Sequence, residues 1–219
     1  MKAPQKKRYE MRLSGSGGQG LITAAVIFAE AVGVYDGKYV CQTQSYGPEA
    51  RGGKSKAEVV ISDHPIDYPK ARRLDLLLAM NQAACDAYYR DLNPDGLLVV
   101  DSSLVEQYPT NRVIAIPFTR IAREQLGKEM VANRVIAIPF TRIAREELGK
   151  EMVANMVALG AVGLLSGQVI SNSLEKALLA RVPPGTEDLN MAALHRGMDE
   201  AAKINLDALP RTILHDEEV

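Results

Sequence analysis

Residues 9–31, with the sequence YEMRLSGSGGQGLITAAVIFAEA, contain the segment that decides the fold. Alternating apolar residues over 9–14 predict a strand, GSGGQG at 15–20 predicts a tight turn, and the alanine-rich run 21–31 predicts a helix. Glycine tolerates the positive φ angles of such a turn and lets a ligand approach the backbone. The N–H groups at the helix start favour a bound anion such as a phosphate. The segment therefore predicts a site for a phosphorylated ligand or a close protein contact, with binding residues Gly15, Gly17, Gly18, Gln19 and Gly20.

Length and composition indicate one globular α/β domain. The chain has 219 residues, of which 47% are hydrophobic and 24% charged, as is ordinary for a globular protein. Its net charge of −1 gives no reason to expect nucleic acid or a membrane as a partner. The apolar runs are too short to span a bilayer, and the basic start at 1–8 lacks the apolar stretch of a signal peptide. We therefore expect a cytoplasmic protein.

Cysteine and histidine usage predicts no metal or cluster site. Cys41 and Cys85 lie far apart, no CxxC occurs, and His64, His195 and His215 have no metal-ligand spacing. We expect both cysteines to be small buried hydrophobic residues. The chain also lacks a GxSxG elbow, an HExxH motif and a P-loop, so we expect no catalytic residue and no metal ligand of its own.

A tandem duplication occupies the middle of the chain. Residues 111–132 read NRVIAIPFTRIAREQLGKEMVA, and residues 133–154 repeat them with Glu147 in place of Gln125. Two copies do not make a solenoid. The duplication is either recent or an artefact of the construction or assembly of the sequence.

Each copy predicts a strand, then a proline, then a helix with Thr119 or Thr141 as its N-cap. The helix of the second copy is expected to continue into the segment that follows it. Because one place in a sheet holds one copy, we expect the other copy to be displaced as an extra strand–helix excursion or a long surface segment that can pair with another chain.

Strands and helices alternate along the rest of the chain. Strands are expected at 38–44, 55–62, 74–80 and 97–101. Helices are expected at 81–90, with Asn81 as the cap, and at 152–167, 173–181 and 189–204. This order predicts an α/β fold with a mixed, mainly parallel sheet and helices on both faces, in a single domain. A basic extension at 1–8 precedes the domain at 9–205, and a polar tail at 206–219 follows it, loosely held or docked on a partner.

A second polar motif, QTQSYGPEARGG at 42–53, follows the second predicted strand. In an open α/β sheet the loops at the carboxyl ends of strands meet, so this loop is expected beside the glycine turn. An arginine there can hold a phosphate or carboxylate through two hydrogen bonds. The candidate binding residues are Gln44, Ser45, Tyr46, Glu49 and Arg51, with Glu49 positioning Arg51; the alternative is a surface turn with a local ion pair.

The glycine spacing also permits a dinucleotide-binding enzyme. That hypothesis requires an acidic residue at the end of the second strand, where this chain has Gln44 and Ser45, while Asp36 precedes the strand. A stand-alone NAD(P)- or flavin-binding oxidoreductase is therefore the weaker alternative. A third interpretation is a scaffold subunit in which the glycines only let the helix pack on the strand.

Taken together, GSGGQG at 15–20 and TQSYGPEARGG at 43–53 resemble the γ subunit of 2-oxoacid:ferredoxin oxidoreductases, most closely the 2-oxoglutarate branch. The resemblance covers residues 9–205 apart from the surplus copy. It implies a complex that oxidatively decarboxylates a 2-oxoacid to an acyl-CoA, CO2 and reduced ferredoxin.

The resemblance also implies a division of labour among subunits. Thiamine diphosphate, Mg and 4Fe-4S clusters are expected on companion α, β and ferredoxin-like δ subunits, with ferredoxin as the electron acceptor. This chain is expected to hold no cofactor alone, to be inactive alone, and to help bind coenzyme A at the glycine turn. A homodimer of the isolated chain is a further expectation. The duplication departs from the family pattern.

Overall fold

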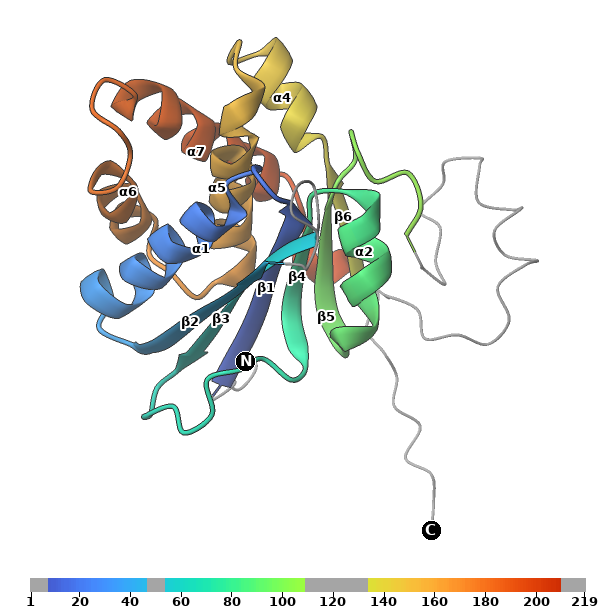
Figure 1. The fold of residues 1–219 in the computed structure, drawn as a ribbon, viewed down its shortest axis with the longest axis vertical. Helices are drawn as coiled ribbons and strands as arrows, with labels where there is room; N and C mark the ends of the chain where they lie inside the picture. The colour runs from blue at the N-terminus through green and yellow to red at the C-terminus, as the bar shows by residue number, and fades with distance from the viewer. Residues whose placement is uncertain (1–7, 47–53, 109–133, 210–219) are drawn as a thin grey trace, which may run out of the picture.

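The computed structural model describes residues 8–46, 54–108 and 134–209. Its centre is a six-stranded sheet with the strand order β2-β3-β1-β4-β5-β6 (Figure 1). Strands β1, β4, β5 and β6 run parallel, whereas β3 is antiparallel to both of its neighbours, β1 and β2. The predicted mixed, mainly parallel sheet is confirmed. The strands are β1 (Arg8–Ser16), β2 (Tyr39–Tyr46), β3 (Lys54–Ser62), β4 (Leu74–Ala79), β5 (Leu92–Asp101) and β6 (Arg134–Ile138).

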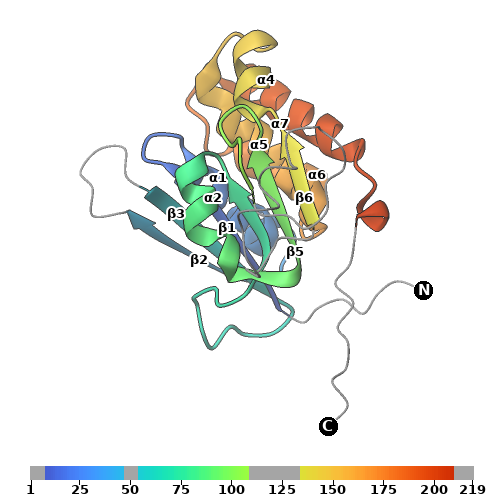
Figure 2. The ribbon, with the colours of Figure 1, turned by 90° about the vertical axis from the view of Figure 1, so that its right-hand side faces the viewer.

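Helices cover the two faces of the sheet unequally (Figures 1 and 2). Most of them pack on one face over the larger hydrophobic core, and α2 (Gln82–Tyr88) packs on the other over a smaller one. The first group comprises α1 (Leu21–Glu30), α4 (Phe140–Glu146), α5 (Ala154–Ser166), α6 (Ser171–Leu179) and α7 (Glu187–Ala202). Short segments are the π-helix η1 (Ala31–Tyr35) and the 3-10 turns η2 (Tyr89–Asp91), η4 (Glu151–Val153) and η5 (Leu206–Ala208).

The alternation in β1 explains why both faces exist. Met11 and Leu13 point into the larger core, while Arg12 lies on the other face and pairs with Glu58 of β3. Apart from Asp75, the β4 strand is apolar and buried, because it is covered on both sides. Burying these side chains supplies the main driving force for the fold.

Helices α5 and α7 approach each other closely because glycines face the crossing. A Cβ at Gly160 would lie 1.9 Å from the carbonyl oxygen of Leu194, and one at Gly197 would lie 1.8 Å from that of Val157. Any side chain would therefore separate the two helices. The glycine content of this region is a packing requirement.

The second copy of the duplication occupies the sheet. It forms β6 and α4, with Phe140 fully buried, while the first copy lies within 109–133, outside the described residues. Two expectations were wrong. The N-cap of α4 is Pro139, two residues before Thr141. Helix α4 ends at Glu146 instead of continuing into α5, with Gly149 at φ 70° in the intervening turn.

Candidate functional site

The glycine turn connects β1 to α1 at the carboxyl edge of the parallel strands (Figure 1). Gly18 and Gly20 adopt positive φ angles of 94° and 71°, and Gly20 is the N-cap of α1. The first N–H groups of a helix have no acceptor within the helix itself. The first turn of α1 carries no acidic side chain that would repel an anion. The turn therefore combines positive φ angles with a helix start that carries no acidic side chain.

The side chain of Gln19 closes one side of this turn. Its Oε1 accepts a hydrogen bond from the N–H of Ser16 at 2.7 Å, and its Nε2 donates to the carbonyl oxygen of Met80 at 3.5 Å. A Cβ at Gly15 would lie 2.3 Å from Gln19 Oε1, so only glycine fits below that amide. Gln19 is thus engaged within the protein, and Gly15 is buried.

The opposite side of the turn is open. Gly17 and Gly18 are exposed, and a Cβ at Gly18 would meet no atom within 4 Å. Gly18 is therefore required by its φ angle and not by packing. Of the five glycine-turn residues proposed from the sequence, Gly17 and Gly18 are the exposed ones.

Asn155 at the start of α5 supports the turn from behind, and sequence reasoning missed it. Its Nδ2 donates to the carbonyl oxygen of Gly20 at 3.2 Å, and a Cβ at Gly20 would lie 2.4 Å from that nitrogen. The side chain is nearly buried against the turn. The only available signal was a polar residue opening an otherwise apolar helix.

Asn81 joins the end of β4 to the same turn. Its Oδ1 accepts from the N–H of Ala84 at 2.8 Å, and its Nδ2 donates to Ser16 Oγ at 2.5 Å. The first bond makes Asn81 the N-cap of α2, as predicted. The second bond fixes the position of β1 relative to β4 at their carboxyl ends.

Asp101 at the end of β5 caps α4 instead of facing the turn. Its carboxylate is fully buried and accepts hydrogen bonds from the N–H and hydroxyl of Thr141 and from the N–H of Ser103. Pro139 at the N-cap has no side-chain acceptor to offer, so the carboxylate reaches the helix from another strand. Asp101 is therefore structural.

The strands that flank the second motif, β2 and β3, pair beside the turn. Tyr46 of β2 pairs with Ser55 of β3, and Ser55 pairs with Gly15 of β1, so the β2–β3 connection leaves the sheet at the same edge. Gln44 and Ser45 are exposed but point to opposite faces, because side chains alternate along a strand. They do not both face one pocket.

The other two residues proposed from this motif, Glu49 and Arg51, lie outside the described residues, as does the side chain of Tyr46.

The sheet topology argues against a dinucleotide-binding fold. In that fold the second strand lies beside the first and parallel to it, and its end carries the acidic residue. Here the antiparallel strand β3 separates β1 from β2. The glycine turn therefore belongs to a different arrangement.

Two chemistries, metal binding and thiol reactivity, depend on side chains of the described residues. No set of three or more histidine, cysteine, aspartate or glutamate side chains among them is placed to hold a metal ion. Burial, with a smaller contribution from Asp86, raises the pKa of the Cys85 thiol to about 12, so it is not a nucleophile at neutral pH. Cys85 is buried as expected, but Cys41 on the edge strand is partly exposed, so the expectation that Cys41 is buried was wrong.

No helix in the described ranges has the length and apolarity needed to cross a bilayer.

Comparison with known proteins identifies the family. Residues 10–200 match the model of the pyruvate ferredoxin/flavodoxin oxidoreductase family. The chain belongs to this family. A 2-oxoglutarate synthase subunit KorC of Methanocaldococcus jannaschii is 45% identical over 203 residues, which cover 91% of this chain and 97% of that protein. A pyruvate synthase subunit PorC of Methanothermobacter thermautotrophicus is 30% identical over 201 residues, covering 90% of this chain and 98% of that protein.

The fold agrees with a solved structure of the family. The keto/oxoacid ferredoxin oxidoreductase γ subunit of Geobacter sulfurreducens superposes with a TM-score of 0.74 at 43% identity, covering 90% of this chain and 98% of that chain. The resemblance to γ subunits of 2-oxoacid:ferredoxin oxidoreductases is therefore confirmed. The chain is a subunit of an oxidoreductase of this family.

Proposed function

We propose that this chain is the γ subunit of a 2-oxoglutarate:ferredoxin oxidoreductase complex, which converts a 2-oxoacid, coenzyme A and oxidised ferredoxin to an acyl-CoA, CO2 and reduced ferredoxin. One observation supports this best: the 45% identity to a 2-oxoglutarate synthase subunit extends over 97% of that protein. Identity to the pyruvate synthase subunit over a similar length is only 30%. The substrate assignment rests on this difference.

In this proposal the redox chemistry belongs to companion chains. The α, β and ferredoxin-like δ subunits hold thiamine diphosphate, Mg and 4Fe-4S clusters, and this chain completes the assembly in the cytoplasm. The isolated chain is expected to be inactive and to form a homodimer.

The glycine turn would bind a phosphate of coenzyme A. Its exposed backbone at Gly17 and Gly18, together with the start of α1, suits a phosphate oxygen, and the closed Gln19 side gives that surface a fixed shape. The adjacent β2–β3 connection carries Arg51, which is proposed to hold a second anionic group. The role of these residues is to bind and orient coenzyme A.

Two experiments test this proposal at separate points. Turnover of the co-expressed complex with 2-oxoglutarate, pyruvate and a branched-chain 2-oxoacid tests the substrate; faster turnover with pyruvate would contradict the assignment. Equilibrium binding of coenzyme A to the complex tests the turn, using Gly18→Val and Arg51→Ala, each of which is expected to weaken binding at least tenfold.

Gly37 offers a matched control for the turn. It has a positive φ of 71° and open space around its Cβ position, like Gly18, but it precedes β2 at the opposite end of the sheet. Gly37→Val carries a comparable backbone strain and should leave coenzyme A binding unchanged. Equal binding by Gly18→Val and Gly37→Val would favour the scaffold interpretation, in which the glycines only pack the helix on the strand.

A further inference from the structure

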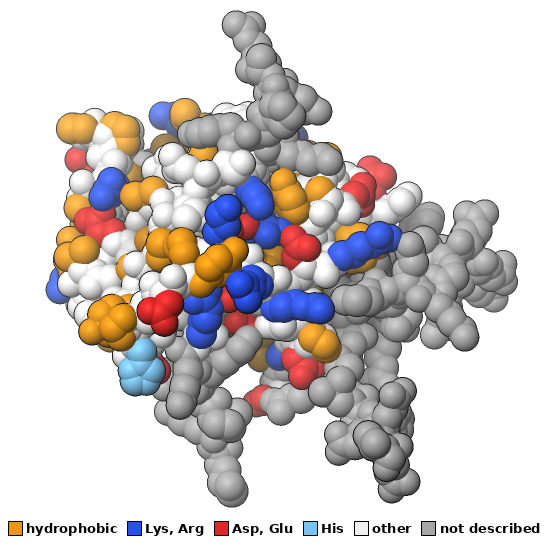
Figure 3. Space-filling view, turned by 60° about the horizontal axis from the view of Figure 1, so that its bottom comes forward, with side chains coloured by type: hydrophobic (Ala, Val, Ile, Leu, Met, Phe, Trp, Pro, Cys, Tyr) orange, Lys and Arg blue, Asp and Glu red, His pale blue; other side chains and the backbone are white. Residues whose placement is uncertain are grey.

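The amino end of β1, at the opposite end of the sheet from the glycine turn, carries a concentration of positive charge. Loop 63–73 connects β3 to β4 there, and Lys70, Arg72 and Arg73 are exposed on it. Lys and Arg side chains gather in the middle of this face (Figure 3). We define Lys70, Arg72 and Arg73 as the basic loop surface.

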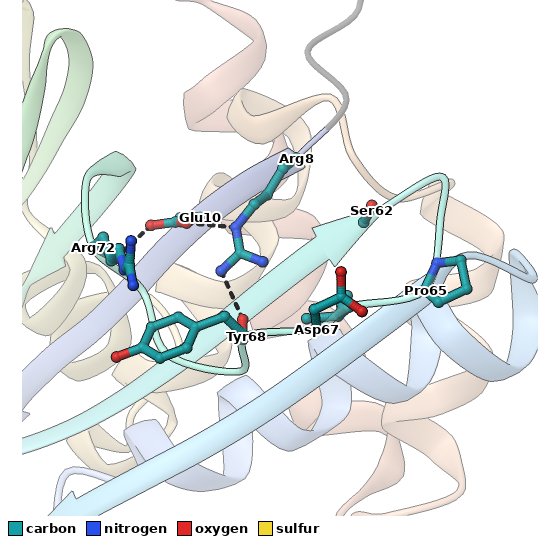
Figure 4. Close-up of a pocket in the computed structure, with 8 residues that line it drawn as sticks. Arg8, Glu10, Ser62, Pro65, Asp67, Tyr68 and Arg72 are labelled. Atoms are coloured by element: carbon teal, nitrogen blue, oxygen red, sulfur yellow. Dashed lines mark hydrogen bonds and ion pairs between the residues drawn. The ribbon is translucent and has the colours of Figure 1, made fainter.

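Two charged side chains of β1, Arg8 and Glu10, hold the backbone of this loop. Glu10 Oε2 accepts hydrogen bonds from the N–H groups of Arg72 at 2.5 Å and Arg73 at 2.9 Å. Arg8 donates to the carbonyl oxygens of Tyr68 at 2.9 Å and Lys70 at 3.1 Å, and its Nε bonds Glu10 Oε1 at 2.6 Å (Figure 4). The loop is thus fixed by charge-assisted hydrogen bonds at four backbone groups.

These hydrogen bonds to the loop backbone leave its cationic side chains free to contact another molecule. The carboxylate of Glu10 accepts hydrogen bonds from backbone N–H groups and from Arg8, so it does not pair with the side chains of the basic loop surface. Within the described parts of the chain, none of the three side chains forms an ion pair, whereas Arg12, Arg145, Arg181 and Arg196 all do. Three of the four residues 70–73 are therefore cations without an anionic partner among the described residues. Such a surface can bind an anionic group of another molecule.

The same loop adds an apolar and aromatic component. A pocket of about 370 Å³ opens beside it, and the guanidinium of Arg72 stacks on the ring of Tyr68 at 4.4 Å (Figure 4). The pocket is lined by Arg8, Glu10, Ser62, Pro65, Ile66, Asp67, Tyr68 and Arg72. The lining is mainly polar and charged, with Pro65 and Ile66 as its apolar part. Tyrosine and arginine beside such a pocket are typical of a protein interface. Asp67 on the pocket rim and the net charge of −1 argue against a broad polyanion such as nucleic acid.

We propose that the basic loop surface docks an acidic surface of a companion subunit in the assembly. Carboxylates of that subunit would pair with Lys70, Arg72 and Arg73, and one of its side chains would enter the pocket beside Tyr68. The surface lies at the end of the sheet opposite the glycine turn, so it binds this partner without competing with coenzyme A. The identity of the partner as a companion subunit rests on the function proposed above.

A triple charge reversal tests this proposal. Lys70→Glu, Arg72→Glu and Arg73→Glu change only side chains, so the backbone bonds to Glu10 and Arg8 remain available and the chain should fold. The matched control is the triple reversal of three other exposed cations that form no ion pair within the described ranges, on α4, before η4 and on α6: Arg142, Lys150 and Lys176. A neutral triple variant to glutamine separates loss of attraction from new repulsion.

The measurement is the dissociation constant of this chain from the co-expressed companion subunits at 50 to 500 mM salt, with circular dichroism to verify folding. The basic-loop reversal should weaken association at least tenfold at low salt and make it less dependent on salt. The glutamine variant should have a dissociation constant between those of the wild type and the reversal. The control should stay within twofold of wild type. Equal association by all variants would overturn the surface assignment while leaving turnover and the proposed function intact.

Two other results also decide the matter. If the wild-type chain associates with no companion subunit, both the proposed function and this surface are wrong. If the reversal abolishes binding to a 30-nucleotide poly(dT) probe or to phosphatidylserine vesicles but not to the companion subunits, the partner class is wrong.

Discussion

Removing one copy of the duplication tests how the extra segment affects the sheet. The connection from Asp101 of β5 to Arg134 of β6 contains 32 residues, and deleting residues 111–132 shortens it to 10. Closing a loop costs conformational entropy that grows with the logarithm of its length, so the shorter chain should be more stable by about 1 kcal/mol. For a chain of this size that raises the unfolding temperature by roughly 2–4 °C.

Deleting residues 133–154 instead gives a chain that differs from the first deletion at one position. Gln125 then occupies the place of Glu147, so this deletion is equivalent to Glu147→Gln in the shortened protein. Glu147 Oε2 accepts from Arg196 Nε at 2.6 Å, joining the end of α4 to α7. Because this pair is about half exposed, its loss should cost only about 0.2–1 kcal/mol.

The difference between the two deletions should depend on pH in a defined direction. The hydrogen bond from Arg196, more than any opposing effect of burial, lowers the pKa of Glu147 below its ordinary value. A carboxylate whose folded pKa is lowered stabilises the fold above its unfolded pKa of about 4.3, and that stabilisation is lost as the pH falls through the folded pKa. The two deletions should therefore differ at pH 7 and converge near pH 3.

Urea unfolding of the three chains at pH 7 and pH 3 measures these quantities. The reasoning is refuted if the chain lacking residues 111–132 unfolds at a lower urea concentration or a lower temperature than the full chain. The first copy would then make contacts that the sheet requires. Equal stability of the two deletions at pH 7 would show that the pair between Arg196 and Glu147 does not favour the second copy.

Three further predictions concern buried groups. Asp101→Ala should cost about 2 kcal/mol in urea unfolding, since it leaves the start of α4 without its acceptor; a cost under about 0.5 kcal/mol would refute the cap. Gly160→Ala should lower the melting temperature, because its Cβ would lie 1.9 Å from the Leu194 carbonyl oxygen, and unchanged melting would contradict that close approach. Burial raises the pKa of Glu58, but hydrogen bonds and charges of Lys56 and Arg12 outweigh it, so its stabilisation should be present at pH 7 and lost on acidification. Arg12→Ala should cost about 3 kcal/mol and reduce that pH dependence to the part that Lys56 supplies.

The sequence predicted the features that depend on neighbouring residues. The glycine turn, the alternation in β1 and the Asn81 cap each follow from a few adjacent positions. The antiparallel placement of β3 also had a local signal: the segment between the second and third strands is too short for the helical crossover that a parallel pair needs. The antiparallel pairing of β2 with β3 could therefore have been predicted.

Features that depend on distant contacts were missed. Thr141 resembled an N-cap, but its hydroxyl bonds Asp101 of another strand, and no pattern near either residue indicates that pairing. Asn155 lies 135 positions from Gly20, whose carbonyl oxygen it binds. Such contacts arise from the packing of α4 and α5 on the sheet. Patterns within short segments of sequence carry no information about that packing.

The arrangement of Gln19 bears on which atoms of the turn can bind a ligand. A flexible glycine loop would lose conformational entropy on binding, which weakens affinity. Here Gln19 bonds Ser16 and Met80, and Asn155 bonds Gly20, so both ends of the turn are fixed before any ligand arrives. The freedom that remains belongs to Gly17 and Gly18. A ligand on this turn therefore meets a preformed backbone surface, and Gln19→Ala should weaken its binding without removing any contact to it.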